Sequence, residues 1–222
     1  MTTTGTTPTT ALPSAARSRS TATAAGTYVG AWLVGLALAP AAPSPDAAAG
    51  DVARHYLDNG AAVLASSTLV HGVAGVALGV FAVSLATSVR VRGGLRRAVI
   101  GTGLAASAAS LAQVVIAATA VSVSDADVQR TASLFDALNL ADVLKIALLA
   151  SFVAVASTAF GRVRRLPRWL RLLTLALVPT LVLGSAALIA PGPVVSAALA
   201  TSLIGLLVWT GSIGLLLLRD DR

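Results

Sequence analysis

Residues 61–89 read AAVLASSTLVHGVAGVALGVFAVSLATSV, a run of 29 residues in which only His71 can carry a charge. A helix of about 20 apolar residues crosses the hydrocarbon core of a bilayer. Because this run is longer than one span needs, we expect a helix that is tilted or that begins late in the run. The run therefore predicts a transmembrane helix and indicates that lipid, as well as water, surrounds the fold.

The rest of the chain has the same apolar character. Hydrophobic residues make up 56% of the 222 residues, charged residues make up 11%, and the mean hydropathy is +0.84. A soluble protein of this size has no means of covering several fully apolar helices. The sequence predicts an all-α, polytopic membrane helical bundle with about six transmembrane helices over 27–218. The predicted spans are residues 27–43, 62–89, 98–121, 139–160, 172–190 and 194–218.

Polar segments flank and interrupt these spans. Residues 1–26 are rich in Thr, Ala and Ser without apolar periodicity, so we expect a disordered cytoplasmic tail, and residues 219–222 are expected to form a second tail. A helix-start signal at Ser44-Pro45-Asp46 and a stop signal at Asn59-Gly60 predict a short extracellular helix over 45–58.

The first span has a second interpretation. Arg17 and Arg19 precede its apolar core, and the small residues Ala41 and Ala42 follow it, as in a signal peptide with its cleavage site. The uncharged stretch is long enough to cross a bilayer, which favours an uncleaved helix. Cleavage would leave five spans.

The basic residues predict an orientation. Of sixteen, thirteen lie in alternate segments: two in the N-terminal tail, four after the second span, five after the fourth and two at the C-terminus. Arginine and lysine collect in cytoplasmic loops, so both termini are predicted to be cytoplasmic. We expect a multi-pass protein of the cell membrane whose partners are the bilayer and the anionic lipid headgroups beside these arginines. The net charge of +7 does not indicate nucleic-acid binding, because the arginines do not share one soluble face.

Ionisable residues inside predicted spans are the candidates for a site, because a charge at the bilayer centre costs about 2.5–3.5 kcal/mol on insertion scales. Asn139, Asp142 and Lys145 recur every three residues and therefore share a broad face of the fourth span. His71 of the second span and Gln113 of the third fall toward the same outer half. These five residues form a candidate ligand-binding cluster for a proton-linked or anionic ligand, with residues 44–60 as a lid.

A structural interpretation stands beside the functional one. Asp142 and Lys145 can pair within their helix, with Lys145 extending to the outer boundary and Asp142 at the headgroups. His71 and Gln113 would then be ordinary hydrogen-bond partners between helices. The sequence leaves both interpretations open.

The sequence points away from catalysis. It has no cysteine, no HExxH, no phosphate-binding glycine loop and no GxSxG, so we assign no catalytic residue, metal site or cofactor. The spacing permits a Ser–Lys dyad of Lys145 with Ser133 or Ser151 but does not favour it. Gly75 and Gly79 give a small-xxx-small spacing that serves either internal packing or homo- or hetero-oligomers.

Four segments carry a resemblance: DVARHYLDN at 51–59, HGVAGVAL at 71–78, LFDALNLADVLKIALLA at 134–150 and LPRWLRLL at 166–173. With them the chain resembles a group of uncharacterised actinobacterial multi-pass membrane proteins, classed as a domain of unknown function. The resemblance implies the membrane class and no activity. We therefore expect a binding, sensory or accessory subunit of the plasma membrane, or alternatively a secondary transporter or channel for a small solute.

Overall fold

The computed structural model describes residues 14–89, 92–163, 166–190 and 192–219. These residues form helices and short connections and contain no strand. The elements are α1 (Ser14–Leu38), α2 (Ala49–Ser67), the π-helical turn η1 (Thr68–Val73), α3 (Ala74–Ser88), α4 (Gly93–Val123), α5 (Val128–Val163), α6 (Arg168–Ser185), the 3₁₀ turn η2 (Ala186–Leu188) and α7 (Pro193–Arg219).

Six helical stretches of the described chain are long and apolar enough to cross a membrane. One of them is continuous from Ala49 to Ser88 and joins α2, η1 and α3. The predicted fold class, an all-α membrane bundle of six helices, is confirmed.

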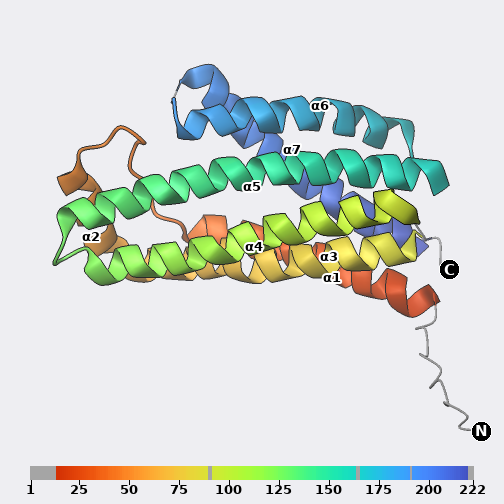
Figure 1. The fold of residues 1–222 in the computed structure, drawn as a ribbon, viewed down its shortest axis with the longest axis horizontal. Coiled ribbons are helices and arrows are strands. Elements are labelled where there is room, and N and C mark those ends of the chain that lie inside the picture. Colours follow the sequence, from red (N-terminus) through yellow and green to blue (C-terminus); the bar gives the residue numbers. More distant parts are fainter. Residues whose placement is uncertain (1–13, 90–91, 164–165, 191, 220–222) are drawn as a thin grey trace, which may run out of the picture.

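The six stretches form a closed ring in chain order. α1 packs against α3, and α3 against α4, and this neighbour order continues through α5 and α6 to α7, which returns to α1 (Figure 1). Short connections favour the neighbour order from α3 to α7, because consecutive antiparallel helices joined by tight turns become neighbours. Helix α2 takes no part in the contacts that close the ring. It packs on α4 and α5.

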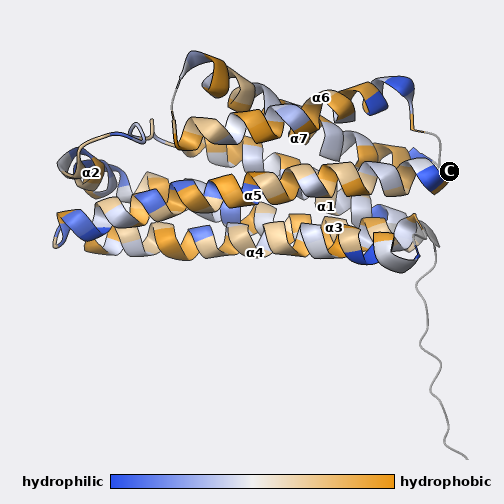
Figure 2. Cartoon of the chain, turned by 45° about the horizontal axis from the view of Figure 1, so that its top comes forward, coloured by the Kyte–Doolittle hydropathy of each residue, from blue (hydrophilic) through white to orange (hydrophobic). Residues whose placement is uncertain are grey.

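The two ends of the bundle differ in charge. The start of α1, the ends of α3, α5 and α7 and the starts of α4 and α6 lie at one end, which we call the arginine end. The opposite, acidic end contains the connections 39–48 and 124–127 and the start of α7 (Figures 1 and 2). The aspartates at or near the acidic end are Asp46, Asp51, Asp58, Asp125, Asp127 and Asp136.

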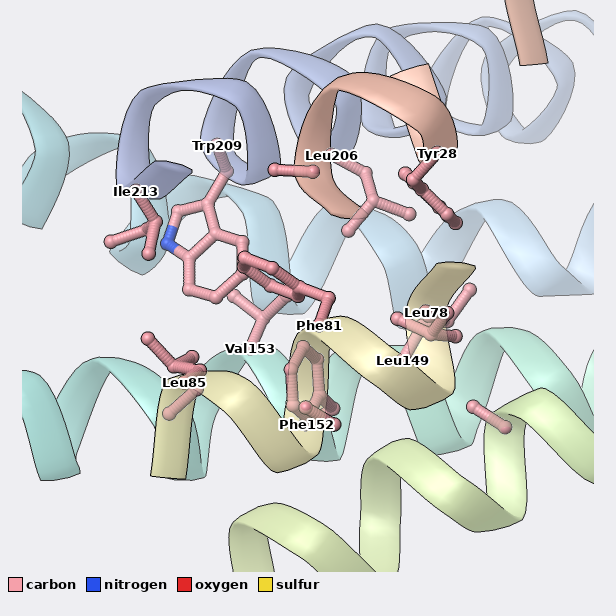
Figure 3. Packing of buried hydrophobic residues seen from close by; sticks show 14 of the residues in the cluster. Tyr28, Leu78, Phe81, Leu85, Leu149, Phe152, Val153, Leu206, Trp209 and Ile213 are labelled. Atoms are coloured by element: carbon pink, nitrogen blue, oxygen red, sulfur yellow. The ribbon is translucent and has the colours of Figure 1, made fainter. Parts of the chain in front are cut away.

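Aromatic side chains fill the middle of the ring. Phe81 of α3, Phe152 of α5 and Trp209 of α7 are at most 1% exposed, and their rings meet edge to face with centroids 6.0–6.5 Å apart (Figure 3). The indole Nε1 of Trp209 donates to Ser157 Oγ at 3.2 Å and to Thr174 Oγ1 at 3.1 Å. The only polar atom of this aromatic cluster is therefore satisfied.

Apolar residues run along the length of the helices (Figure 2), and many large ones are exposed on the outside of the bundle. Large side chains such as Leu175, Val194 and Ile204 are 65–72% exposed although they lie within predicted spans. Water disfavours such a surface, whereas hydrocarbon accepts it.

The predicted boundary between the N-terminal tail and the first helix, at residues 26–27, is wrong. Helix α1 begins at Ser14, so residues 14–26, predicted to be disordered, are helical; residues 1–13 of the predicted tail lie outside the described residues. Small side chains allow α1 to pack tightly: a Cβ on Gly214 would lie 2.7 Å from Ala25 Cβ. Ser20 Oγ also lies 3.2 Å from Ser84 Oγ. Contacts with α7 and α3, rather than local propensity, extend the helix.

The predicted short helix over 45–58 is wrong as a separate element. The helix begins at Ala49 and continues through Asn59-Gly60 into the second span. Asn59 donates its side-chain amide to the His55 carbonyl at 3.1 Å. A Cβ on Gly60 would lie 2.9 Å from Val121 Cγ1, so this glycine permits close packing on α4 and does not end the helix.

The third and fourth spans are also longer than predicted, since α4 continues to Val123 and α5 begins at Val128. The turn between them is short because Asp127 Oδ1 accepts the Arg130 N–H at 2.9 Å and caps α5. The beginning of α2 packs on these extensions through Val52, Tyr56, Ala120 and Phe135. The acidic end is thus a packed helical extension. The sixth span, at Pro193–Arg219, agrees with its prediction within one residue, and residues 220–222 lie outside the described residues.

Candidate functional site

Lys145 is the centre of a polar cluster inside the bundle. Its side chain is buried, and Nζ donates to Gln113 Oε1 at 2.8 Å and to Asp142 Oδ1. The third acceptor is His71 Nδ1, at 3.2 Å. An ammonium group has three donors, so each of its protons has a partner.

The contact with Lys145 determines the tautomer of His71. An ammonium group cannot accept a hydrogen bond, so Nδ1 of His71 is the acceptor and the ring proton is on Nε2. The imidazole is therefore neutral. Its Nε2–H has no partner among the residues that the structure describes.

A π-helical turn positions His71. Residues Thr68–Val73 form η1, which adds one residue to the turn within an otherwise α-helical stretch. Helix α1 presses on this turn, since a Cβ on Gly35 would lie 2.5 Å from Val70 Cγ2. Such π-turns are frequent at functional sites. No local sequence signal predicts it.

Gln113 links the cluster to the backbone. The side chain is completely buried, and its Nε2 lies 3.5 Å from the Leu138 carbonyl of α5. A buried amide with one end on an ammonium and the other on a carbonyl holds α4 and α5 in register.

Four of the five predicted site residues come together: Asp142, Lys145, His71 and Gln113. Asn139 makes no hydrogen bond to them and lines an adjoining cavity instead. The predicted extension of Lys145 to the outer boundary is wrong, because its side chain is 4% exposed and points into the bundle, while that of Asp142 is 27% exposed. Three acceptors inside the bundle hold the ammonium group more favourably than the boundary would.

Two cavities meet at this cluster. The inner cavity, about 220 Å³, lies between α1, η1, α5 and α7, and the end cavity, about 270 Å³, lies under the 40–43 connection. Both are lined by Ser66, His71, Asp142 and Leu188. Walls of the inner cavity are otherwise mostly apolar and include Trp32, Leu36, Val70, Lys145, Ile146, Leu199 and Leu203.

The end cavity has a more polar wall. His55 and Tyr56 of α2 line it together with Ser67 and Asn139. The Ser67 hydroxyl is buried and has no hydrogen-bond partner among the described residues. A buried hydroxyl without a partner costs about 1–3 kcal/mol, so a polar molecule in the end cavity that bonded to Ser67 would be favoured.

The cavities do not continue to the arginine end. Phe152 follows Lys145 by seven residues on α5, about 10 Å along the helix axis. There it packs with Phe81 and Trp209 in the aromatic cluster. In this conformation the polar cluster is therefore accessible from the acidic end and is separated from the arginine end.

Gly75 and Gly79 serve internal packing. Both are buried against α4: a Cβ on Gly75 would lie 3.0 Å from Ser110 Cβ, and one on Gly79 would lie 3.0 Å from Ser107 Oγ. The Gly75 carbonyl accepts the Ser107 hydroxyl at 2.7 Å. This face of α3 is covered within the chain, which leaves it unavailable to a partner.

The chemistry of the cluster suits binding. Asp142 and Lys145 compensate each other's charge, and His71 is neutral, so the cluster as a whole carries no net charge. Within the described chain, no group of three His, Asp or Glu side chains could hold a metal ion. Free polar groups beside an apolar cavity are typical of small-molecule sites.

Comparison with known proteins adds no assignment, since no family model, curated protein or solved structure matches this chain. The resemblance drawn from the four sequence segments stays a prediction.

Proposed function

We propose that this protein is a plasma-membrane binding, sensory or accessory subunit that takes up a small ligand at the His71–Asp142–Lys145 cluster. One observation carries the proposal: two cavities meet at His71 and Asp142, beside the unpartnered hydroxyl of Ser67. A cavity with a few convergent polar groups is the usual form of a small-molecule site.

The proposed orientation places the arginine end in the cytoplasm. Lys145 lies 18 residues from the end of α5, about 27 Å along the axis. The hydrocarbon core is about 30 Å thick, so arginines at the inner boundary put the cluster close to the outer one. A ligand would then enter from outside the cell by a short path.

A secondary transporter is the second candidate, and the inner cavity favours it. The inner cavity lies on the far side of Asp142 from the end cavity. It could therefore hold a solute in transit. Passage to the cytoplasm would require Phe81, Phe152 and Trp209 to separate, so alternating access fits this candidate better than an open channel does. An enzymatic role has no comparable support. Membership of the actinobacterial family is part of the proposal and adds no activity to it.

Ligand entry can be tested with single cysteines, because the natural chain has none. We expect Ser67→Cys to react with a small, charged, membrane-impermeant methanethiosulfonate added from outside intact cells. The matched control is Gly101→Cys, at an exposed position of α4 with no atom near its Cβ, where lipid keeps the thiol from the reagent. Reaction of neither cysteine before denaturation, with reaction of both after it, would contradict entry and with it the proposed function.

A further inference from the structure

The polar cluster restricts the charge of its ligand, and this restriction rests on the proposed function. The charges of Asp142 and Lys145 sum to zero, and the neutral His71 ring accepts a hydrogen bond from Lys145. An ion that entered alone would bring an uncompensated charge to a largely buried, charge-balanced cluster, which is costly. The bound ligand therefore adds no net charge, either as a neutral molecule or as an ion accompanied by its counter-charge.

Two groups beside the cluster can donate to a ligand, while Asp142 and the Ser67 oxygen can also accept. His71 Nε2–H and the Ser67 hydroxyl have no partner among the described residues, and both residues line the end cavity. Lys145 has already committed its three protons. Two neighbouring donors match a group with two acceptor atoms, such as a carboxylate.

The inner cavity indicates the remainder of the ligand. Beyond the polar groups its walls are mostly apolar, with Leu36, Val70, Leu199 and Leu203. Its volume of about 220 Å³ equals that of about seven water molecules in the liquid. A short alkyl chain fits such a space, whereas a polyol or an amino acid would lose its hydration there without replacement.

We infer that the ligand is a short-chain monocarboxylate that binds together with one proton. The proton goes to Asp142, which becomes a neutral carboxylic acid. The ligand carboxylate accepts from Ser67 Oγ–H and from His71 Nε2–H, the ring nitrogen that does not face Lys145, and its negative charge balances the positive charge of Lys145 once Asp142 is neutral. One carboxylate and one proton enter, one O–H bond forms on Asp142, no bond of the ligand changes, and the site stays neutral.

Few other groups can take the proton. Lys145 faces Asp142 from the same helix, His71 faces it from η1, and Gln113 of α4 does not titrate. Helix α2 adds His55 to the end cavity. The described residues that line the cavities from α1, η2 and α7 have no acidic or basic side chain. Among these groups, Asp142 is the one whose negative charge a proton would remove, and it pairs directly with Lys145. We therefore assign the proton to Asp142.

The test is calorimetric titration of the full-length protein in nanodiscs with butyrate and with butyramide, its neutral isostere. We expect butyrate to bind with uptake of one proton, measured in buffers of different ionisation enthalpy. Its affinity should fall tenfold per pH unit between pH 6 and 8. Butyramide should bind at least tenfold more weakly at pH 6.

Two variants separate the steps. Asp142→Asn keeps the shape of the side chain without the titrating group, so butyrate should bind without proton uptake and without the pH dependence. Ser67→Ala leaves the charged cluster intact, and we expect about tenfold weaker butyrate binding with the proton uptake unchanged. If Asp142→Asn does not fold, the Ser67→Ala result and the proton count of the natural chain still decide the inference.

The failures are distinguishable. Butyramide that binds as tightly as butyrate, or butyrate that binds without a proton, would overturn the monocarboxylate inference and leave ligand binding in place. No binding of butyrate, with Ser67→Cys reactive from outside, would overturn the inference alone. An unreactive Ser67→Cys would remove the proposed function as well.

Discussion

Lys145 Nζ lies 2.8 Å from Gln113 Oε1, and this contact joins two adjacent transmembrane helices through a fully buried hydrogen bond. The ammonium group would otherwise have only Asp142 and His71 as partners. A neutral amide completes its coordination without adding charge. Gln113 thus supports a buried lysine close to the cavities.

We expect Gln113→Leu to destabilise the protein. The change leaves one proton of a buried ammonium group without an acceptor, which costs about 1–3 kcal/mol. Thermal unfolding in detergent measures the loss. Gln129→Leu, at an exposed position near the start of α5, is the matched control and should change stability by less than about 0.5 kcal/mol. Equal effects of the two changes would mean that the amide is dispensable.

Asp142 and Lys145 should behave as a coupled pair. Asp142→Asn or Lys145→Met alone leaves a buried charge without its partner, and loss of one partner of a buried pair costs about 3–5 kcal/mol. The 27% exposure of the Asp142 side chain places the expected loss toward the lower figure. Replacing both residues together should restore much of the membrane abundance, which is measured by immunoblot and fluorescence-detected gel filtration.

The surface pair of Asp51 and Arg54 provides the comparison, because its charged atoms are 3.6 Å apart and both side chains are more than 60% exposed. Removal of that pair should change stability by at most about 1 kcal/mol. If the double variant of Asp142 and Lys145 regains abundance and still binds ligand, the pair serves folding alone, and the proposed site is wrong.

The sequence alone predicts more of the fold than of the site. Six apolar runs predict the helices, because hydrocarbon requires a regular hydrogen-bonded backbone. Local sequence does not predict the beginning of α1, because contacts with distant parts of the chain stabilise it, such as that of Gly214 in α7 with Ala25 in α1. Asn59-Gly60 does not end the helix as its local sequence predicts, because contacts with α4 stabilise the helix through this point.

For the site, residue type predicts which side chains take part, but the sequence does not predict how they are arranged. Four side chains could be named because polar groups are rare in apolar spans. The π-turn around His71 and the missing partner of Ser67 depend on how α1, α2 and α5 pack. A serine in an apolar helix usually donates to the carbonyl of the preceding turn, so its sequence position does not mark it.

Two glycines of α4 should respond in opposite ways to alanine. A Cβ on Gly103 would overlap Ala82 Cβ and lie 3.2 Å from Phe152 Cε2, whereas a Cβ on Gly101 meets no atom within 4 Å. Overpacking costs about 1–3 kcal/mol, while alanine in place of glycine in an open helix position gains about 0.5–1 kcal/mol. We therefore expect Gly103→Ala to lower the unfolding temperature and Gly101→Ala to maintain or raise it. Equal shifts would mean that α3 and α4 are less closely packed.

The orientation can be tested with cysteines at Arg54 and Gly94. Arg54 is exposed near the acidic end, and Gly94 is exposed in the first turn of α4 at the arginine end, so neither change disturbs the core. Arginine-rich segments remain in the cytoplasm because their translocation is disfavoured. An impermeant maleimide added to intact cells should label Arg54→Cys, and Gly94→Cys should react only after permeabilisation. Labelling of Gly94→Cys alone from outside would invert the topology and turn both cavities toward the cytoplasm, and equal labelling at both positions would exclude a single orientation.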